Sequence, residues 1–112
     1  MSSHSITLTW NRDGKEFGYK EYSRDHDLDF GHGILMRASA AADYLGTAEI
    51  PDPEQAFVAS LSSCHMLTFL ALASLQNLTL ESYTDKAVGY LEKGDNGKPV
   101  LSRIELHPVT VW

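Results

Sequence analysis

The sequence contains a single cysteine, Cys64, which lies in a long stretch of the chain without charge. No Asp, Glu, Lys or Arg occurs from Gln55 to Leu80. A thiolate is a nucleophile and a reductant, but an ordinary thiol is only a few per cent ionised at neutral pH. Cys64 is therefore either a small buried hydrophobic side chain, the commoner role of a free helical cysteine, or a redox centre that a nearby cation activates.

Any cation that activates Cys64 is expected to come from another segment of the chain. His65 is adjacent, but neighbouring helical residues point about 100° apart, so its ring faces away from the thiol. Arg24 suits the role by residue type, because a guanidinium keeps its charge and the polar segment 23–27, SRDHD, can reach across. The alternative for Arg24 is simple solvation at the surface. The other upstream cations are Arg12, Lys15, Lys20 and Arg37.

A helix over residues 53–76 is predicted to carry Cys64. Asp52 suits the N-cap, Pro53 suits the first helical position, and Asn77 suits the C-terminal cap. A helix of this length measures about 35 Å at 1.5 Å per residue.

Apolar side chains cover nearly the whole circumference of this predicted helix. A helix that is apolar on every side is buried on every side, and one small sheet covers only one of them. We therefore expect an obligate homodimer with the helix near its interface. The length also fits a membrane span, but the segment is too rich in Ser, Thr, His, Gln and Asn for lipid, so no membrane association is expected. The apolar positions are Phe57, Val58, Leu61, Met66, Leu67, Phe69, Leu70, Leu72 and Leu75.

The hydrophobic pattern elsewhere predicts strands on both sides of the helix. Residues 5–10, SITLTW, alternate between apolar and polar types, as a half-buried strand does. Turns are expected at residues 11–14, NRDG, and 94–97, GDNG. Strands before and after one helix indicate an α+β fold, an antiparallel sheet with a long central helix. Further strands are predicted over 17–22, 34–39, 79–92 and 99–112, with loops over 23–27 and 40–51.

The last predicted strand contains Pro108, which is expected at a bulge or a sheet edge because proline cannot donate to the strand ladder. The side chains expected to face the helix are Ile104, Leu106, Val109 and Val111.

Composition and charge bound the class of protein. A length of 112 residues predicts a single domain, and the formal charge of −6 argues against nucleic-acid binding. One cysteine cannot form an internal disulfide, and the five histidines show no metal-ligand spacing, so no metal site is expected. The first residues lack the charged segment and apolar stretch of a signal peptide, so a cytoplasmic protein is expected.

The segment DPEQAFVASLSSCHMLTFLALA resembles the central helix of the OsmC/Ohr family of organic hydroperoxide reductases. The family pattern is an Asn/Asp-Pro-Glu start with a reactive cysteine ten residues after the glutamate, and these positions are Glu54 and Cys64 here. Arg24 and Asp25 precede Gly33 with the spacing of the family's Arg-Asp pair. The stretches YSRDH and SSCHMLTFL resemble the OsmC-like branch in particular, and the resemblance spans about residues 5–112.

The resemblance implies an OsmC-like fold, an intertwined homodimer and a cysteine-based peroxidase in the stress response. The Cys64 thiolate would attack the distal peroxide oxygen, releasing an alcohol and leaving a sulfenic acid. Arg24 would stabilise the thiolate and the leaving oxygen, and Glu54 would hold the guanidinium in a bidentate pair. Four side chains would form an apolar pocket for the hydroperoxide, or else belong to the dimer core: Phe57, Met66, Phe69 and Leu70.

The chain departs from the family pattern at its C-terminal end. Family peroxidases carry a resolving cysteine in a later helix, whereas this sequence ends at Trp112. The sequence is therefore either a truncated version of a longer protein, which we favour, or a member without the resolving thiol. We expect a single domain over residues 1–112 that lacks the C-terminal helix and strand of the full fold. No bound cofactor is expected, and an external thiol or dithiol would be the reductant. The alternatives are a one-cysteine peroxidase and a dimer without turnover that serves as a thiol sensor or binds apolar ligands.

The spacing of Glu54 and Cys64 raises a geometric question about the implied site. Ten residues along one helix are about 15 Å, too far for both side chains to touch one small substrate. Either Arg24 bridges the two lengthwise, or antiparallel packing of two central helices brings Glu54 of one subunit beside Cys64 of the other. We favour the second arrangement because a dimer is expected.

Overall fold

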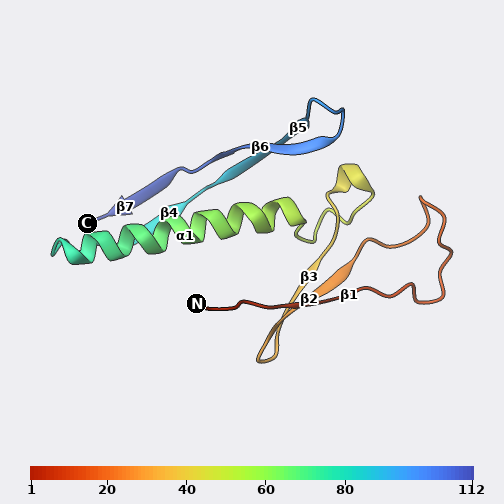
Figure 1. Ribbon diagram of the computed structural model, residues 1–112, viewed down its shortest axis with the longest axis horizontal. Coiled ribbons are helices and arrows are strands. Elements are labelled where there is room, and N and C mark those ends of the chain that lie inside the picture. Colours follow the sequence, from red (N-terminus) through yellow and green to blue (C-terminus); the bar gives the residue numbers. More distant parts are fainter. The chain divides into compact units, whose positions relative to one another are not determined.

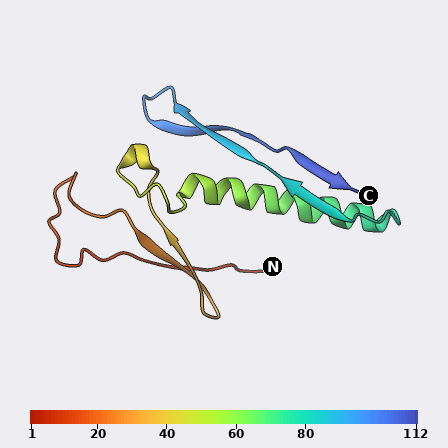
Figure 2. The ribbon, with the colours of Figure 1, turned by 180° about the vertical axis from the view of Figure 1, so that it is seen from behind.

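The computed structural model describes residues 1–112, which form two compact units, Met1–Pro53 and Glu54–Trp112 (Figures 1 and 2). All paired strands are antiparallel and one long helix is present, so the predicted α+β class is confirmed. The elements are β1 (Thr7–Thr9), β2 (His26–Gly31), β3 (Ile34–Ala38), a short 3₁₀ helix η1 (Ala42–Tyr44), α1 (Pro53–Leu75), β4 (Ser82–Asp85), β5 (Val88–Lys93), β6 (Pro99–Glu105) and β7 (Pro108–Val111).

The first unit contains a three-stranded sheet in the order β1-β2-β3. Strands β2 and β3 form a hairpin whose two turn residues, His32 and Gly33, both have positive φ, 57° and 78°. A two-residue turn with this backbone matches the twist of the flanking strands, which explains the glycine at the second position.

Two sequence-based predictions for the segment before and at the start of β2 are wrong. Residues 23–27 were expected to form a loop, but the strand begins at His26, and the strand expected over 17–22 is a turn and bend instead. Strand β2, HDLDFG, carries an aspartate at every second position from Asp27, and Arg37 on β3 pairs with Asp27 at 3.0 Å. Cross-strand charge pairing of this kind stabilises a strand that hydrophobic alternation does not reveal.

Helix α1 confirms the predicted helix to within one residue at its C-terminal end. Asn77 has a φ of 60°, Leu78 N donates to Ala73 O at 3.0 Å, and Asn77 N donates to Ser74 O at 3.0 Å. These bonds form a Schellman cap around a left-handed residue, as expected for asparagine at this position.

Each of the two long strands expected after α1 is interrupted. Strands β4 and β5 are separated at residues 86–87, and β6 and β7 are separated at 106–107, so that β4 pairs with β7 and β5 with β6. His107 N donates to the Asp85 carboxylate at 2.7 Å at this interruption. The predicted turn at 94–97 joins β5 to β6.

One side of α1 packs on the strands of its own unit, and α1 runs alongside β4 and β7 in both ribbon views (Figures 1 and 2). The side chains that are buried or half-buried recur every three or four residues, as one helical face does. At Gly89 the helix approaches β5 so closely that an added Cβ would lie 2.6 Å from Val58 Cγ2. From Val58 onward, the buried or half-buried residues of α1 are Val58, Ser62, Met66, Phe69 and Ala73; Glu54 and Ala56 in its first turn are also half-buried.

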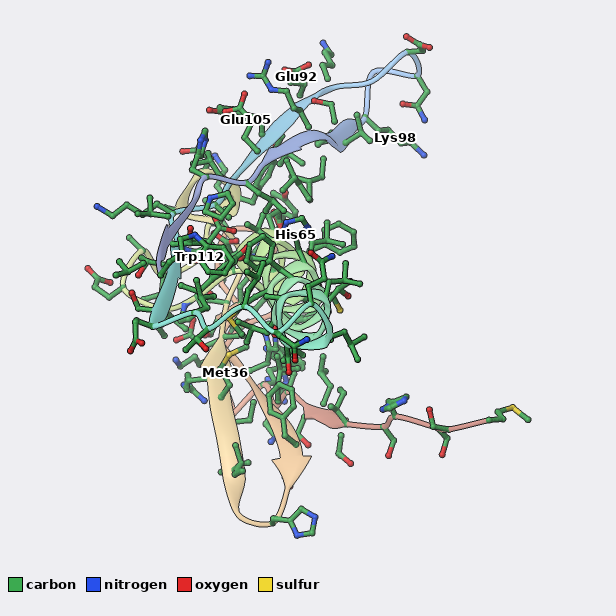
Figure 3. The ribbon with its side chains drawn as sticks, turned by 90° about the vertical axis from the view of Figure 1, so that its left-hand side faces the viewer. Met36, His65, Glu92, Lys98, Glu105 and Trp112 are labelled. Atoms are coloured by element: carbon green, nitrogen blue, oxygen red, sulfur yellow. The ribbon has the colours of Figure 1, made fainter.

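The inner face of β7 differs from the prediction. Ile104 and Leu106 are half-buried as expected, but Val109 and Val111 are 64% and 51% exposed. Strand β7 pairs with β4 in a regular register from Pro108 to Val111, so Pro108 does not lie at a bulge; it lies in a strand with a single partner, as a sheet edge has, and Thr110 is the half-buried residue of β7. The irregularity lies on the other strand pair, between Tyr90 and Leu91. Trp112 stacks on Phe69, with ring centroids 6.0 Å apart; Figure 3 shows it beside α1.

Candidate functional site

Cys64 is exposed on the side of α1 that faces away from the unit's own strands. Ser62, two residues before it and about 200° around the helix, donates a hydrogen bond to Asp85 of β4. Phe57 and Leu61 flank Cys64 on its own side and are 53% and 42% exposed. The thiol therefore lies within a stripe of uncovered apolar side chains.

Only one of the four predicted pocket residues shares this side with Cys64. Phe57 lies seven residues before the thiol, about 20° from it around the helix. Met66 and Phe69 are half-buried toward the strands, and Phe69 contacts the Tyr83 ring at a centroid distance of 5.7 Å. Leu70, 36% exposed, lies on a flank about 120° from Cys64. The structure does not bring these four side chains together around the thiol.

Glu54 lies in the first turn of α1 and is half-buried. A carboxylate in the first turn interacts favourably with the positive end of the helix dipole. The structure places Glu54 and Cys64 on one helix, about 15 Å apart along its axis.

By length and composition alone, α1 could also cross a membrane. One of its sides is nevertheless engaged with the unit's strands through the Ser62 hydroxyl and the Phe69 ring. This packing is what a helix covering a sheet shows.

Arg24 lies in the first unit, immediately before β2, and its guanidinium is held by local contacts. Nη1 donates to Tyr22 O at 2.7 Å, and Nη2 donates to Tyr19 O at 2.5 Å. The guanidinium carbon lies 3.6 Å from the Tyr22 ring centroid and 5.1 Å from that of Tyr19. Stacking on an aromatic face favours a guanidinium and fixes its plane. We name Arg24 with Tyr19 and Tyr22 the arginine clamp.

Hydrogen bonds also fix the backbone on both sides of Arg24. Trp10 Nε1 donates to Ser23 O at 2.8 Å, and the His26 ring contacts Arg24 O through Nδ1 at 2.8 Å. Asp25 N donates to Ser23 Oγ at 3.1 Å. The loop therefore presents the guanidinium from a defined position.

The Asp25 carboxylate anchors this loop to the segment that leads into α1. Thr47 Oγ1 donates to Asp25 Oδ1 at 2.8 Å, and Ser39, which is fully buried, accepts a hydrogen bond from Thr47 N at 3.1 Å. The hydrogen bonds from Thr47 and then Ser39, with the charge of Arg37, hold the pKa of Asp25 below its ordinary value despite partial burial. Sequence reasoning missed this role, although the adjacent Arg-Asp pair is its signal.

An aromatic cavity of about 310 Å³ borders the arginine clamp within the first unit. The rings of Trp10, Phe17 and Tyr22 contact one another with centroids 4.9 to 6.1 Å apart. Arg24 supplies a fixed positive charge at this largely apolar wall. Such a cavity can hold an apolar group whose polar end accepts hydrogen bonds. Sequence reasoning missed it because the aromatic residues were interpreted as a strand.

The family of the chain is decided by comparison with known proteins. The family model of OsmC-like protein matches residues 46–111, more than half of the chain. The chain belongs to the OsmC family. A solved structure of an OsmC-like protein of unknown function from Vibrio cholerae O1 biovar eltor is similar over 99% of this chain and 75% of that chain, with 45% identity and a TM-score of 0.90. A search of curated proteins found no match.

Family membership confirms the resemblance and the OsmC-like fold expected from the sequence. The match to the OsmC family model includes Glu54 and Cys64 and begins after Arg24. The V. cholerae structure, which covers nearly all of this chain, extends the similarity to the segment of the arginine clamp. The pairing of Arg24 with Glu54 and Cys64 joins the two units and stays a prediction.

Proposed function

We propose that this OsmC protein reduces organic hydroperoxides to alcohols, with Cys64 as the redox centre. The observation that carries the proposal is the position of the thiol: it is exposed and flanked by apolar side chains such as Phe57 and Leu61. An uncharged organic hydroperoxide can bring its apolar part against such a surface while its peroxide group meets the sulfur.

The proposed first step is a two-electron transfer from sulfur to peroxide. The Cys64 thiolate sulfur bonds to the distal peroxide oxygen while the O–O bond breaks. The leaving alkoxide takes up one proton and departs as the alcohol. The sulfur keeps the hydroxyl group as a sulfenic acid, so sulfur is oxidised by two electrons and the peroxide is reduced by two.

An external thiol is proposed to complete the cycle by acting on Cys64, which is the one cysteine within these 112 residues. The first thiol attacks the sulfenic sulfur, releases water and forms a mixed disulfide with Cys64. A second thiol attacks the external sulfur of that disulfide, which releases the Cys64 thiolate and an oxidised disulfide of the reductant. The proposed reaction steps require no bound cofactor.

Arg24 is proposed to stabilise negative charge during the reaction, and Glu54 is proposed to position Arg24. The Arg24 guanidinium would stabilise the thiolate and the negative charge that develops on the leaving oxygen. Glu54 would hold the guanidinium through a charge-assisted pair. The arginine clamp supports this proposal, since a fixed donor lowers the cost of organising the transition state.

A homodimer is proposed to complete the site. The uncovered side of α1 exposes Phe57, Leu61, Leu67, Leu72 and Leu75, which a second copy of the chain would bury. Antiparallel packing of two α1 helices would bring Glu54 of one subunit near Cys64 of the other. A cytoplasmic role in the stress response fits a free thiol of this kind.

The same exposed apolar surface favours one alternative function. A dimer with this fold could bind apolar ligands or sense oxidants through Cys64 without turnover. The two functions differ in whether the sulfenic acid is reduced back to the thiol in successive cycles.

Turnover assays separate the proposal from the alternative. Purified protein is mixed with cumene hydroperoxide and dithiothreitol, and peroxide loss is measured over many equivalents. We expect multiple turnovers, faster with cumene hydroperoxide than with hydrogen peroxide, and none for Cys64→Ser. A single equivalent consumed, with Cys64 trapped as sulfenic acid in the mass spectrum, would establish the sensor instead.

Subunit mixing tests the composite site. Glu54→Ala and Cys64→Ser proteins are combined under conditions that exchange subunits. Each heterodimer then holds one doubly defective site and one intact site, so activity partly returns. No recovery after proven exchange would mean that both residues serve a site within one chain.

A further inference from the structure

A cleft on the opposite side of α1 from Cys64 lies wholly within the second unit and has a volume of about 500 Å³. We propose that this cleft binds a small primary ammonium ion that carries an apolar group. The proposal does not involve the thiol chemistry, so either can fail alone. Its polar lining includes Ser62, Tyr83 and Asp85, with Gln55 and Ser63, and its apolar lining includes Val58, Met66 and Ala87.

Asp85 supplies a fixed negative charge to the cleft. Ser62 Oγ donates to one carboxylate oxygen at 2.5 Å, and His107 N donates to the other at 2.7 Å. The Ser62 hydrogen bond, assisted by the His107 backbone bond, lowers the pKa of this carboxyl, so it is ionised at neutral pH. Each carboxylate oxygen keeps a further lone pair, so the anion is oriented but can still accept a hydrogen bond.

Tyr83 supplies a hydroxyl group that has no partner. Its oxygen is buried and makes no hydrogen bond. Burial and the nearby charge of Asp85 raise the pKa of this phenol, so the hydroxyl stays neutral. A buried polar group without a hydrogen bond is costly, and a ligand that supplies a donor removes that cost.

The chemistry of the cleft selects the ligand class. An ammonium group has three N–H donors, enough to reach both Asp85 and the Tyr83 oxygen. An anion would be repelled by Asp85. A metal ion is disfavoured because no group of three His, Cys, Asp or Glu side chains gathers in the structure. The apolar wall favours a hydrocarbon substituent on the amine over a bare ammonium ion.

Two histidines bear on the charge that a ligand would meet. His107 and His65 both act on Asp85, and Figure 3 shows His65 on the side of α1 where the strands of this unit lie. Protonated histidines would compete with a cationic ligand.

Nuclear magnetic resonance of the complete ¹⁵N-labelled chain tests the site. Benzylammonium is titrated, and the amide signal of His107, whose N–H bonds Asp85, is followed with that of Ser62. We expect saturable shifts at both positions with benzylammonium and weaker ones with neutral benzyl alcohol. Equal shifts with benzyl alcohol, or no saturable shift with either compound, would overturn the proposal.

Two variants separate binding from folding. Asp85→Asn should weaken benzylammonium about tenfold or more, as expected for loss of a charged hydrogen-bond partner. The matched change Asp95→Asn, in the exposed β5–β6 turn, should leave binding unchanged. If Asp85→Asn does not fold, Tyr83→Phe decides: it removes the orphan hydroxyl, so the midpoint of thermal unfolding should not fall while affinity drops severalfold. Unchanged affinity in Tyr83→Phe would contradict the proposed site.

Discussion

Two hydrogen bonds and two aromatic rings hold the Arg24 guanidinium within residues 1–53, whereas the side of α1 around Cys64 carries mainly exposed apolar side chains. The arginine is organised by its own loop and needs nothing else to be oriented. The thiol is positioned by a rigid helix, but its surroundings are incomplete within the second unit. If Arg24 and Cys64 serve one site, as we propose, the charge is already oriented by its own loop, whereas the surroundings of the thiol have to be completed by another surface.

Removing the organised charge should have the largest effect. Arg24→Ala is expected to lower kcat/KM for cumene hydroperoxide by about 10²–10³-fold, as for the loss of a donor to a developing oxyanion. Arg24→Lys should restore only part of this, because an ammonium cannot stack and fork as a guanidinium does. Steady-state peroxide reduction measures both. The control is Arg12→Ala, which removes another arginine of the N-terminal segment and should leave kcat/KM nearly unchanged.

The uncovered side of α1 offers the next largest effect. Leu61→Asp would place a charge where a second copy is expected to pack, so the dimer should dissociate. The molecular mass measured by light scattering should fall from roughly twice 12.4 kDa to about 12.4 kDa. Leu45→Asp changes a similarly exposed residue outside α1, 46% against 42%, and should not change the mass. A wild-type protein that is already a monomer at micromolar concentration would refute the dimer.

The arginine clamp should show a smaller effect than the arginine itself. Tyr22→Leu removes the ring that stacks at 3.6 Å but keeps the carbonyl that accepts from Nη1. We expect a loss of about 0.5–2 kcal/mol in transition-state stabilisation, up to about 30-fold in kcat/KM. Tyr44→Leu, on the exposed η1 helix, is the matched control. An equal rate for both variants would show that the ring does not orient Arg24.

The anchor at Asp25 gives the smallest effect, and it depends on pH. A carboxyl whose folded-state pKa is lowered contributes stability above its unfolded value of about 3.9, and this is lost as pH falls through the folded pKa. Thr47→Val removes the first cause of that shift, so the free energy of unfolding should fall by about 1–2 kcal/mol at neutral pH. Urea titrations should show this difference shrinking as pH falls below the unfolded value and through the lowered folded-state pKa of Asp25, where the carboxyl becomes protonated in both states. Thr84→Val should show no such pH dependence.

Local signals explain which parts of the fold were predictable. The Asp52-Pro53 start and the Asn77 stop of α1 are encoded in single residues, and so is the glycine-containing turn at 94–97. Strand β2 was not predictable from alternation because Asp27 finds its partner, Arg37, ten residues away. Cross-strand charge pairs become visible only once the hairpin is known.

The residues of the candidate site could be selected from the sequence by type, but the orientations of their side chains could not be predicted. Cys64, Glu54 and the Arg-Asp pair stand out by motif. A helix that is apolar all round has no preferred face, so its sequence cannot reveal that Met66 and Phe69 turn toward the strands. The hydrogen bonds of the arginine clamp likewise go to backbone carbonyls, which every residue carries and no sequence pattern marks.

The contact between Gly89 and Val58 sets the rotational phase of α1. A helix of nearly uniform hydrophobicity could roll about its axis with little change in buried area. The absent Cβ of Gly89 leaves a notch into which Val58 fits, and a side chain there would meet the valine at 2.6 Å. Once Val58 is seated, the 3.6-residue period turns Ser62 inward and Cys64 outward. The missing Cβ of one strand residue therefore determines in which direction the Cys64 side chain points, although the two residues lie several ångströms apart.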